Sequence, residues 1–81
     1  MELWIVVDSL SNEPEVFSNR GEAEAFALEI LEDYQSRWKF EQEEYEEARE
    51  DITKADITRV CWGTYLGECE VNIYKKFLPY D

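Results

Sequence analysis

The spacing of apolar residues between positions 20 and 52 constrains the fold of this chain more than any other feature. In its first part, apolar side chains recur three and four residues apart, which is the pattern of one face of an α-helix. These residues are Ala23, Phe26, Ala27, Ile30, Leu31, Tyr34 and Trp38. Asn19 is placed to cap the helix N-terminus, and Glu22, three residues later, completes a capping box. One helix over residues 20–52 would be about 50 Å long, whereas a strand of about ten residues reaches only about 33 Å. We therefore expect the helix either to break near residues 36–40 or to overhang the sheet on which it packs.

Two β-hairpins are predicted, one on each side of this helical region. The first pairs residues 3–7 (LWIVV) with residues 15–17 across a turn-forming segment. The second pairs residues 56–66 with residues 68–78, where apolar and polar side chains alternate. The expected fold class is therefore α+β, with an antiparallel sheet of about four strands in ββαββ order packed against one long or broken acidic helix. We expect a single domain spanning residues 1–81.

The second hairpin also predicts the state of the two cysteines. A turn at residues 66–67 pairs Tyr65 with Glu68, and in that register Cys61 and Cys69 point to opposite faces of the sheet. We therefore expect two free thiols, as is usual in a reducing cytoplasm. No apolar run approaches the roughly 18 residues of a membrane span, and no signal peptide is visible. The expected location is the cytoplasm.

Negative charge is concentrated in the predicted helical region. The chain has 20 Asp and Glu against 8 Lys and Arg, which gives a formal net charge of −12. Twelve of the acids lie between Glu22 and Asp51, and seven of them fall within residues 41–51 (EQEEYEEARED). Like-charge pairs four residues apart, such as Glu43 and Glu47, each cost roughly 0.2–0.5 kcal/mol. A face selected for stability alone would mix the two signs, so this arrangement indicates that the negative field itself is used. Because such a field attracts basic partners and repels nucleic acids and anionic membranes, we expect no direct nucleic-acid or membrane binding.

Catalytic chemistry finds little support in the sequence. The chain contains no His, the side chain that most often transfers protons near neutral pH. It has no Gly-rich phosphate-binding loop and no nucleophile elbow, and two Cys without His do not make an ordinary zinc site. Glu43, Glu44 and Glu47 could approach a hard cation, but they lack the loop geometry of a dedicated calcium site. We therefore expect a protein that is not an enzyme and that has no cofactor or metal.

The acidic residues are instead predicted to bind a partner protein by imitating nucleic-acid phosphates. Carboxylates three or four residues apart on a helix are about 5–6 Å from each other, which is roughly comparable to the spacing of phosphates along a nucleic-acid strand. A rigid acidic helix could therefore occupy the Lys- and Arg-lined groove of a nucleic-acid-binding protein. The predicted charge array comprises Glu41, Glu43, Glu44, Glu46, Glu47, Glu50 and Asp51, extended by Glu29, Glu32 and Asp33.

Three other interpretations of this region stay open. The acids could form a solvated face that only keeps the protein soluble. A heptad-like seam from Leu31 to Ala55 is expected to pack on the protein's own hairpins, although an antiparallel homodimer or a docking surface would also use it. Trp38, Phe40 and Tyr45 could be exposed and anchor a partner. The protein would then be a structural or regulatory interaction module that docks through its aromatics or a sheet edge.

In length, in the lack of a catalytic motif and in the acidic segment at residues 41–51, the chain resembles the small inhibitors that bacteriophages make against host defences. Anti-CRISPR proteins and anti-restriction DNA mimics are the familiar cases. Residues 16–27 (VFSNRGEAEAFA) are also similar in style to small phage-encoded open reading frames. The resemblance implies a non-enzymatic inhibitor in the host bacterial cytoplasm. Its partner would be a nucleic-acid-binding defence complex, such as a CRISPR effector, whose basic channel it fills. These inhibitors share no common fold, so the resemblance assigns no role to individual residues.

Overall fold

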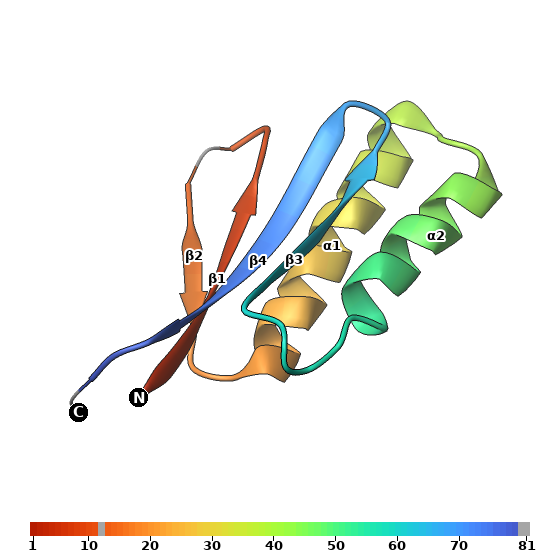
Figure 1. The fold of residues 1–81 in the computed structure, drawn as a ribbon. Helices are drawn as coiled ribbons and strands as arrows, with labels where there is room; N and C mark the ends of the chain where they lie inside the picture. The colour runs from red at the N-terminus through yellow and green to blue at the C-terminus, as the bar shows by residue number, and fades with distance from the viewer. Residues whose placement is uncertain (12, 80–81) are drawn as a thin grey trace.

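Two helices lie side by side on one face of a four-stranded antiparallel sheet (Figure 1). The computed structural model describes residues 1–11 and 13–79. The elements are β1 (Glu2–Asp8), β2 (Glu15–Phe17), α1 (Arg20–Trp38), α2 (Gln42–Thr53), β3 (Cys61–Leu66) and β4 (Cys69–Phe77). The strands are arranged in the order β2-β1-β4-β3, so β1 and β4 form the centre of the sheet. The predicted α+β class and the four-stranded antiparallel sheet are confirmed.

The helical region forms two helices, so the element order is ββααββ and the expected order ββαββ was wrong. Of the two expected forms of the helix, long or broken, the structure has the broken one. Lys39 is the C-cap of α1. It adopts a left-handed backbone conformation with φ of 49° and donates its N–H to the carbonyl of Gln35. The side-chain amide of Gln35 then binds both the N–H and the carbonyl of Phe40, each at 2.9 Å. These bonds replace the helical pattern, and α2 runs back along α1 over the sheet (Figure 1). The break at residues 39–41 overlaps the predicted region, residues 36–40. A continuous helix would have extended beyond the sheet, and its second half would have had no sheet to cover.

The register of the β3–β4 hairpin differs from the predicted one by two residues. Leu66 pairs with Cys69 and Tyr65 with Glu70, so the pairing of Tyr65 with Glu68 was wrong. The two-residue loop consists of Gly67, with φ of 65°, and Glu68. This loop leaves Leu66 in the strand, where its side chain is buried in the core. A shift of two residues keeps every side chain on its face, and Cys61 is exposed whereas Cys69 is buried, both as free thiols.

The first strand of this hairpin, predicted at residues 56–66, was also too long at its N-terminal end. β3 starts at Cys61, and the residues before it form a loop. Asp56 holds this loop, because its Oδ1 accepts hydrogen bonds from the backbone N–H of Thr58 at 2.9 Å and from the Thr58 hydroxyl at 2.8 Å. An Asp side chain that binds the backbone two residues on is a turn former, and it ends the extended chain that alternation alone had predicted.

The core lies between the sheet and the two helices. α1 places Ala23 and Ala27 against the strands, and such small side chains allow close approach of the two layers. Leu31, Tyr34, Ala48 and Ile52 of the heptad-like seam are buried in the same core. These parts of the seam therefore pack on the protein's own sheet, as favoured above, whereas Trp38 and Glu41 within it are exposed. Other core side chains are Val6, Trp62, Leu66, Val71 and Ile73.

Asn19 caps α1 as predicted. Its side-chain oxygen accepts a hydrogen bond of 2.8 Å from the backbone N–H of Glu22. No helix in the described part of the chain is both long enough and apolar enough to cross a membrane.

Candidate functional site

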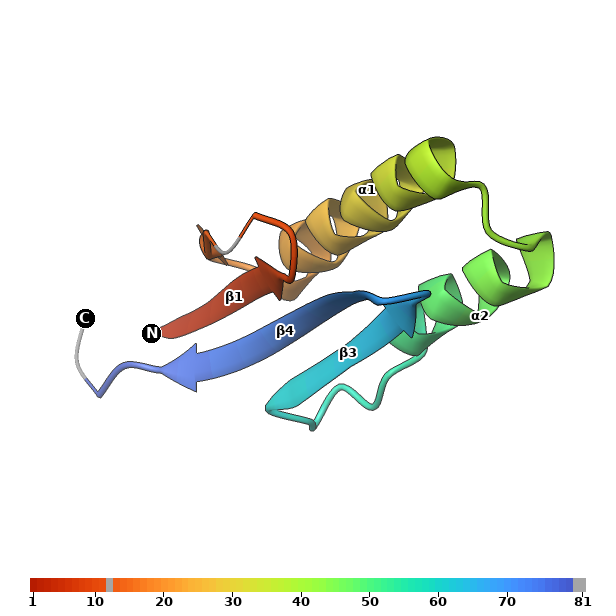
Figure 2. The ribbon, with the colours of Figure 1, turned by 90° about the horizontal axis from the view of Figure 1, so that it is seen from above.

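All ten predicted site residues are exposed to solvent on the helical layer. Glu29, Glu32 and Asp33 lie on α1, Glu41 precedes α2, and the remaining six belong to α2. The two helices cover one side of the sheet (Figure 2), so these carboxylates share one side of the molecule. We call them the acidic helical surface. The carboxylates of the predicted charge array are therefore exposed, and they are divided between the two helices.

The structure gathers these acids into smaller groups. Glu29, Glu32 and Asp33 surround a shallow depression on α1 together with Ser36. On α2, Glu46 and Glu50 border another depression. A third lies between α2 and β3, where Glu50 and Asp51 meet Asp56 and Arg59.

Few of these charges are neutralised within the protein. Ion pairs among the described residues reach two of the ten, joining Asp33 to Arg37 at 3.1 Å and Glu50 to Lys54 at 3.2 Å. Both pairs are solvent-exposed, and exposed pairs contribute little stability. Six carboxylates make neither an ion pair nor a side-chain hydrogen bond in residues 1–11 and 13–79. They are Glu29, Glu32, Glu41, Glu43, Glu44 and Glu47.

Two members of the array have hydrogen bonds of their own. Glu46 accepts one of 3.2 Å from the side-chain amide of Gln42. Asp51 accepts one of 2.8 Å from the hydroxyl of Thr64, a β3 residue that is only 5% exposed. Asp51 therefore fixes α2 to β3 and is a structural contact as well as a surface charge.

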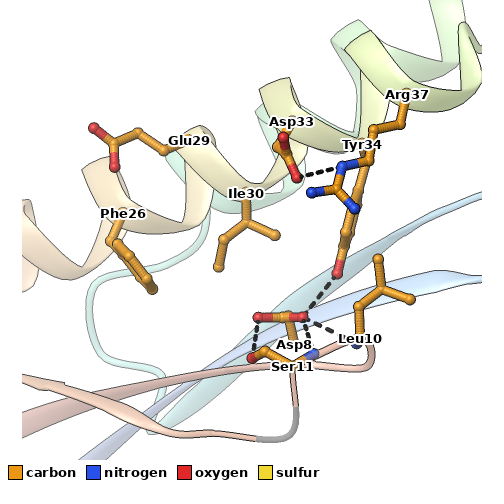
Figure 3. Close-up of a pocket in the computed structure, with 9 residues that line it drawn as sticks. All are labelled: Asp8, Leu10, Ser11, Phe26, Glu29, Ile30, Asp33, Tyr34 and Arg37. Atoms are coloured by element: carbon orange, nitrogen blue, oxygen red, sulfur yellow. Dashed lines mark hydrogen bonds and ion pairs between the residues drawn. The ribbon is translucent and has the colours of Figure 1, made fainter.

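A groove lies next to the acidic helical surface, along the side of α1 that faces the turn after β1. Its first part is a hollow of about 430 Å³ between α1 and the turn after β1. Figure 3 shows Phe26 and Ile30 pointing from α1 toward the strands, with Asp33 and Arg37 on the rim. The second part, a hollow of about 460 Å³, shares Leu10 with the first. We call the two hollows together the groove.

Apolar side chains line the second part of the groove. Leu10 is 50% exposed and Trp38 is 48% exposed, and Phe40 lies beside them in a half-buried position. Glu68 adds a negative charge at its rim. Of the three aromatics whose exposure was left open, Trp38 is thus the accessible one, whereas Phe40 and Tyr45 are half-buried.

Asp8 and Tyr34 form the polar floor of the groove. Asp8 accepts hydrogen bonds from the N–H groups of Leu10 and Ser11 at 2.9 Å, from the Ser11 hydroxyl at 2.9 Å and from the Tyr34 hydroxyl at 3.1 Å (Figure 3). Burial by itself would raise the pKa of Asp8, but the hydrogen bonds from Ser11, Leu10 and Tyr34 outweigh it and lower that pKa. Burial, together with the charge of Asp8, raises the pKa of Tyr34 far above its usual range. The pair therefore keeps one protonation state near neutral pH, which suits a structural contact.

The groove was missed in the sequence because it depends on the turn after β1. Asp8 followed by Ser11 is a turn signal, and Leu10 is an apolar residue inside this polar turn. Neither feature shows that the turn folds against α1.

No group of three or more His, Cys, Asp or Glu in the described residues could hold a metal ion. No protein-family model, curated protein or solved structure matches this chain.

Proposed function

We propose that this chain is a non-enzymatic inhibitor that binds a basic, nucleic-acid-binding protein through its acidic helical surface and keeps nucleic acid away from it. The observation that carries this proposal is the set of six exposed carboxylates that have no ion-pair or hydrogen-bond partner in the described residues. A stable fold does not need such a set, since like charges on neighbouring helical turns repel each other.

The arrangement of the acids supports imitation of a polyanion. Carboxylates on successive turns of one helix are about 5–6 Å apart, and axes of packed helices are about 8–10 Å apart. Glu29, Glu32 and Asp33 on α1 and the α2 acids thus form two neighbouring rows. The Lys and Arg side chains of a phosphate-binding partner would neutralise these rows and displace the cations held near them, as they do on nucleic acid. Host-defence complexes with a basic channel, CRISPR effectors among them, are the partner class that we propose.

The test is capture of partners from nuclease-treated bacterial lysate on the immobilised protein, followed by elution with duplex DNA or guide RNA. We expect a nucleic-acid-binding complex that is displaced by the competitor and that dissociates as ionic strength rises. The variant Glu43→Lys/Glu47→Lys should lose at least about 90% of the captured complex, since phosphate-like contacts dominate binding.

A matched control separates position from net charge. Glu13→Lys/Glu15→Lys lies outside the helical layer and, at +2 per substitution, also changes the formal charge from −12 to −8. This control should capture the complex as well as the unmodified chain does. Equal losses in both variants, or full capture by the helix variant, would refute recognition by the acidic helical surface.

The groove supports a second candidate function, a docking module that holds an apolar anchor of a partner. The exposure of Trp38 and Leu10 beside a hollow is the observation that favours it. Apolar docking responds weakly to salt. A complex that persists at high ionic strength and is lost with Trp38→Ser, but not with Glu43→Lys/Glu47→Lys, would assign the function to the groove.

A further inference from the structure

Apolar residues predominate on the face of the sheet that points away from the helices, which also carries Asn72, Glu70 and Lys76. Figure 2 shows both helices on one side of the strands. Val6, Val71 and Ile73 are buried under the helices, and because side chains alternate along a strand, their neighbours point to the opposite side. We call that side the open face. It carries Leu3, Ile5, Val7, Val16, Tyr65 and Tyr74, of which Tyr65 is 67% exposed and Tyr74 is 42% exposed.

These apolar side chains form a continuous row across all four strands. Val16 of β2 pairs with Ile5 of β1, Ile5 pairs with Tyr74 of β4, and Tyr74 pairs with Cys61 of β3. An antiparallel sheet with one face in water ordinarily shows polar residues on that face. The uninterrupted apolar run of β1 is instead typical of a strand that is covered on both sides.

The open face is also electrically neutral. Among the strand residues that point to this side, the charged ones are Glu70 and Lys76, near opposite ends of β4. Their charges cancel on a chain whose formal charge is −12. A basic partner is attracted to the acidic helical surface on the far side, whereas a second copy of this chain meets the least repulsion here.

We propose that the open face is the interface of a symmetric homodimer in which the two β4 strands cross in antiparallel directions. A two-fold interface uses one patch twice, so the patch must be complementary to itself. With a two-fold axis perpendicular to the strands, Glu70 of one copy faces Lys76 of the other, and the contact occurs twice. An axis parallel to the strands would instead place Glu70 against its own copy. Two twisted sheets pack face to face in this way at about 10 Å and about −30°.

The dimer also keeps like charges apart. Each acidic helical surface lies on the far side of its own sheet (Figure 2), so the two surfaces point in opposite directions. The proposed function does not depend on this dimer, because one copy already presents a whole acidic helical surface.

The experiment is sedimentation equilibrium of the full chain and its variants over a range of concentrations. We expect a particle of twice the 9.7 kDa chain mass at high concentration. Glu70→Lys and Lys76→Glu should each raise the dissociation constant about tenfold or more, since each reversal alters two symmetric contacts. The double variant Glu70→Lys/Lys76→Glu should restore the dissociation constant to within about threefold, and circular dichroism should show all variants folded.

The two single variants distinguish pairing from net charge. Glu70→Lys makes the chain less negative and Lys76→Glu makes it more negative, so repulsion between copies alone would move their dissociation constants in opposite directions. Glu43→Lys/Glu47→Lys serves as the helical-layer control and should not weaken the dimer. A chain that stays monomeric up to about 0.5 mM, well above the dissociation constants of specific interfaces, would overturn the proposal. A dimer whose dissociation constant is unchanged by both charge reversals would also overturn the proposal. That is the result expected if two copies pair through their β3 edges.

The thiol of Cys61 gives a second measurement on the unmodified chain. Cys61 is exposed at the end of the apolar row, whereas Cys69 is buried in the core. In the dimer we expect the maleimide reaction of Cys61 to slow several-fold as protein concentration rises through the dissociation constant, while Cys69 stays protected throughout. A reaction rate independent of concentration would contradict burial of the open face.

Discussion

Asp8 collects four hydrogen bonds at the end of β1, and through them the turn after β1 is attached to α1. Its carboxylate accepts from two backbone N–H groups and from the hydroxyls of Ser11 and Tyr34. A hydrogen bond to a charged group makes a net contribution of about 1.5–3 kcal/mol to stability. One residue therefore positions the apolar groove as well as the turn.

Asp8→Asn should lower the free energy of unfolding by about 1–2 kcal/mol at pH 7, since the amide accepts fewer and weaker bonds. The hydrogen bonds lower the pKa of Asp8 in the folded protein. The stabilisation that the ionised Asp8 carboxylate contributes is therefore complete above the pKa of an unfolded Asp, about 3.9. It disappears as the pH falls through the lower pKa of the folded state. Urea unfolding at pH 7 and at about pH 2.5 measures this. A difference between wild type and variant that is equal at both pH values would contradict the role of the ionised carboxylate.

Gly67 connects two elements at the far end of the molecule. It has φ of 65° in the β3–β4 turn, and a Cβ there would lie 2.3 Å from the ring of Phe40, which belongs to the connection between α1 and α2. The close approach of this ring is therefore possible only with glycine at position 67. The contact joins the helix pair to the tip of the hairpin.

Gly67→Ala should destabilise the protein by about 2 kcal/mol or more, because it combines a strained backbone with a collision. Phe40→Ala is the matched background, in which the collision is absent but the backbone strain remains. The cost of Gly67→Ala should therefore be smaller by about 1 kcal/mol in that background, as measured by chemical denaturation. Equal costs in both backgrounds would show that only the backbone conformation matters.

The sequence predicted most elements but not how they are joined. The helix cap at Asn19 and the break of the helix follow from local chemistry and from the length of the sheet. The hairpin register does not, since a single glycine fits a two-residue loop at 66–67 as well as at 67–68. Burial of Leu66 decides between them, and that is a tertiary effect. Lys39 likewise ends α1 without the glycine that usually marks such a cap.

At the scale of the whole molecule, the unequal distribution of charge has an energetic cost. A formal charge of −12 on 81 residues destabilises the compact state by self-repulsion. The exposure of the ten acids could be predicted, because helical periodicity assigns them to the polar face. The groove and the open face could not, because they depend on which elements become neighbours.

Salt should therefore stabilise this protein. Raising NaCl from about 0.02 M to about 0.5 M shortens the screening length from roughly 20 Å to roughly 4 Å. A gain of about 1 kcal/mol corresponds to about 4–8 °C in Tm for a domain of this size. We expect a rise of that order in calorimetry, and a smaller rise for Glu43→Lys/Glu47→Lys. A Tm that is unchanged or lower at high salt would show that the acids do not repel each other appreciably.

The pairing of β1 with β4 also governs how the chain can fold. These central strands come from opposite ends of the described chain, and the amino group of Met1 binds the carbonyl of Leu78, 77 residues away. Contacts between distant segments require entropy to be lost before any stabilisation is gained, which slows folding. The helix pair and the β3–β4 hairpin are local and can form early. A nascent chain, however, has only half of this sheet until β4 has left the ribosome, so the acidic helices receive their complete support only after β4 has paired with β1 and β3.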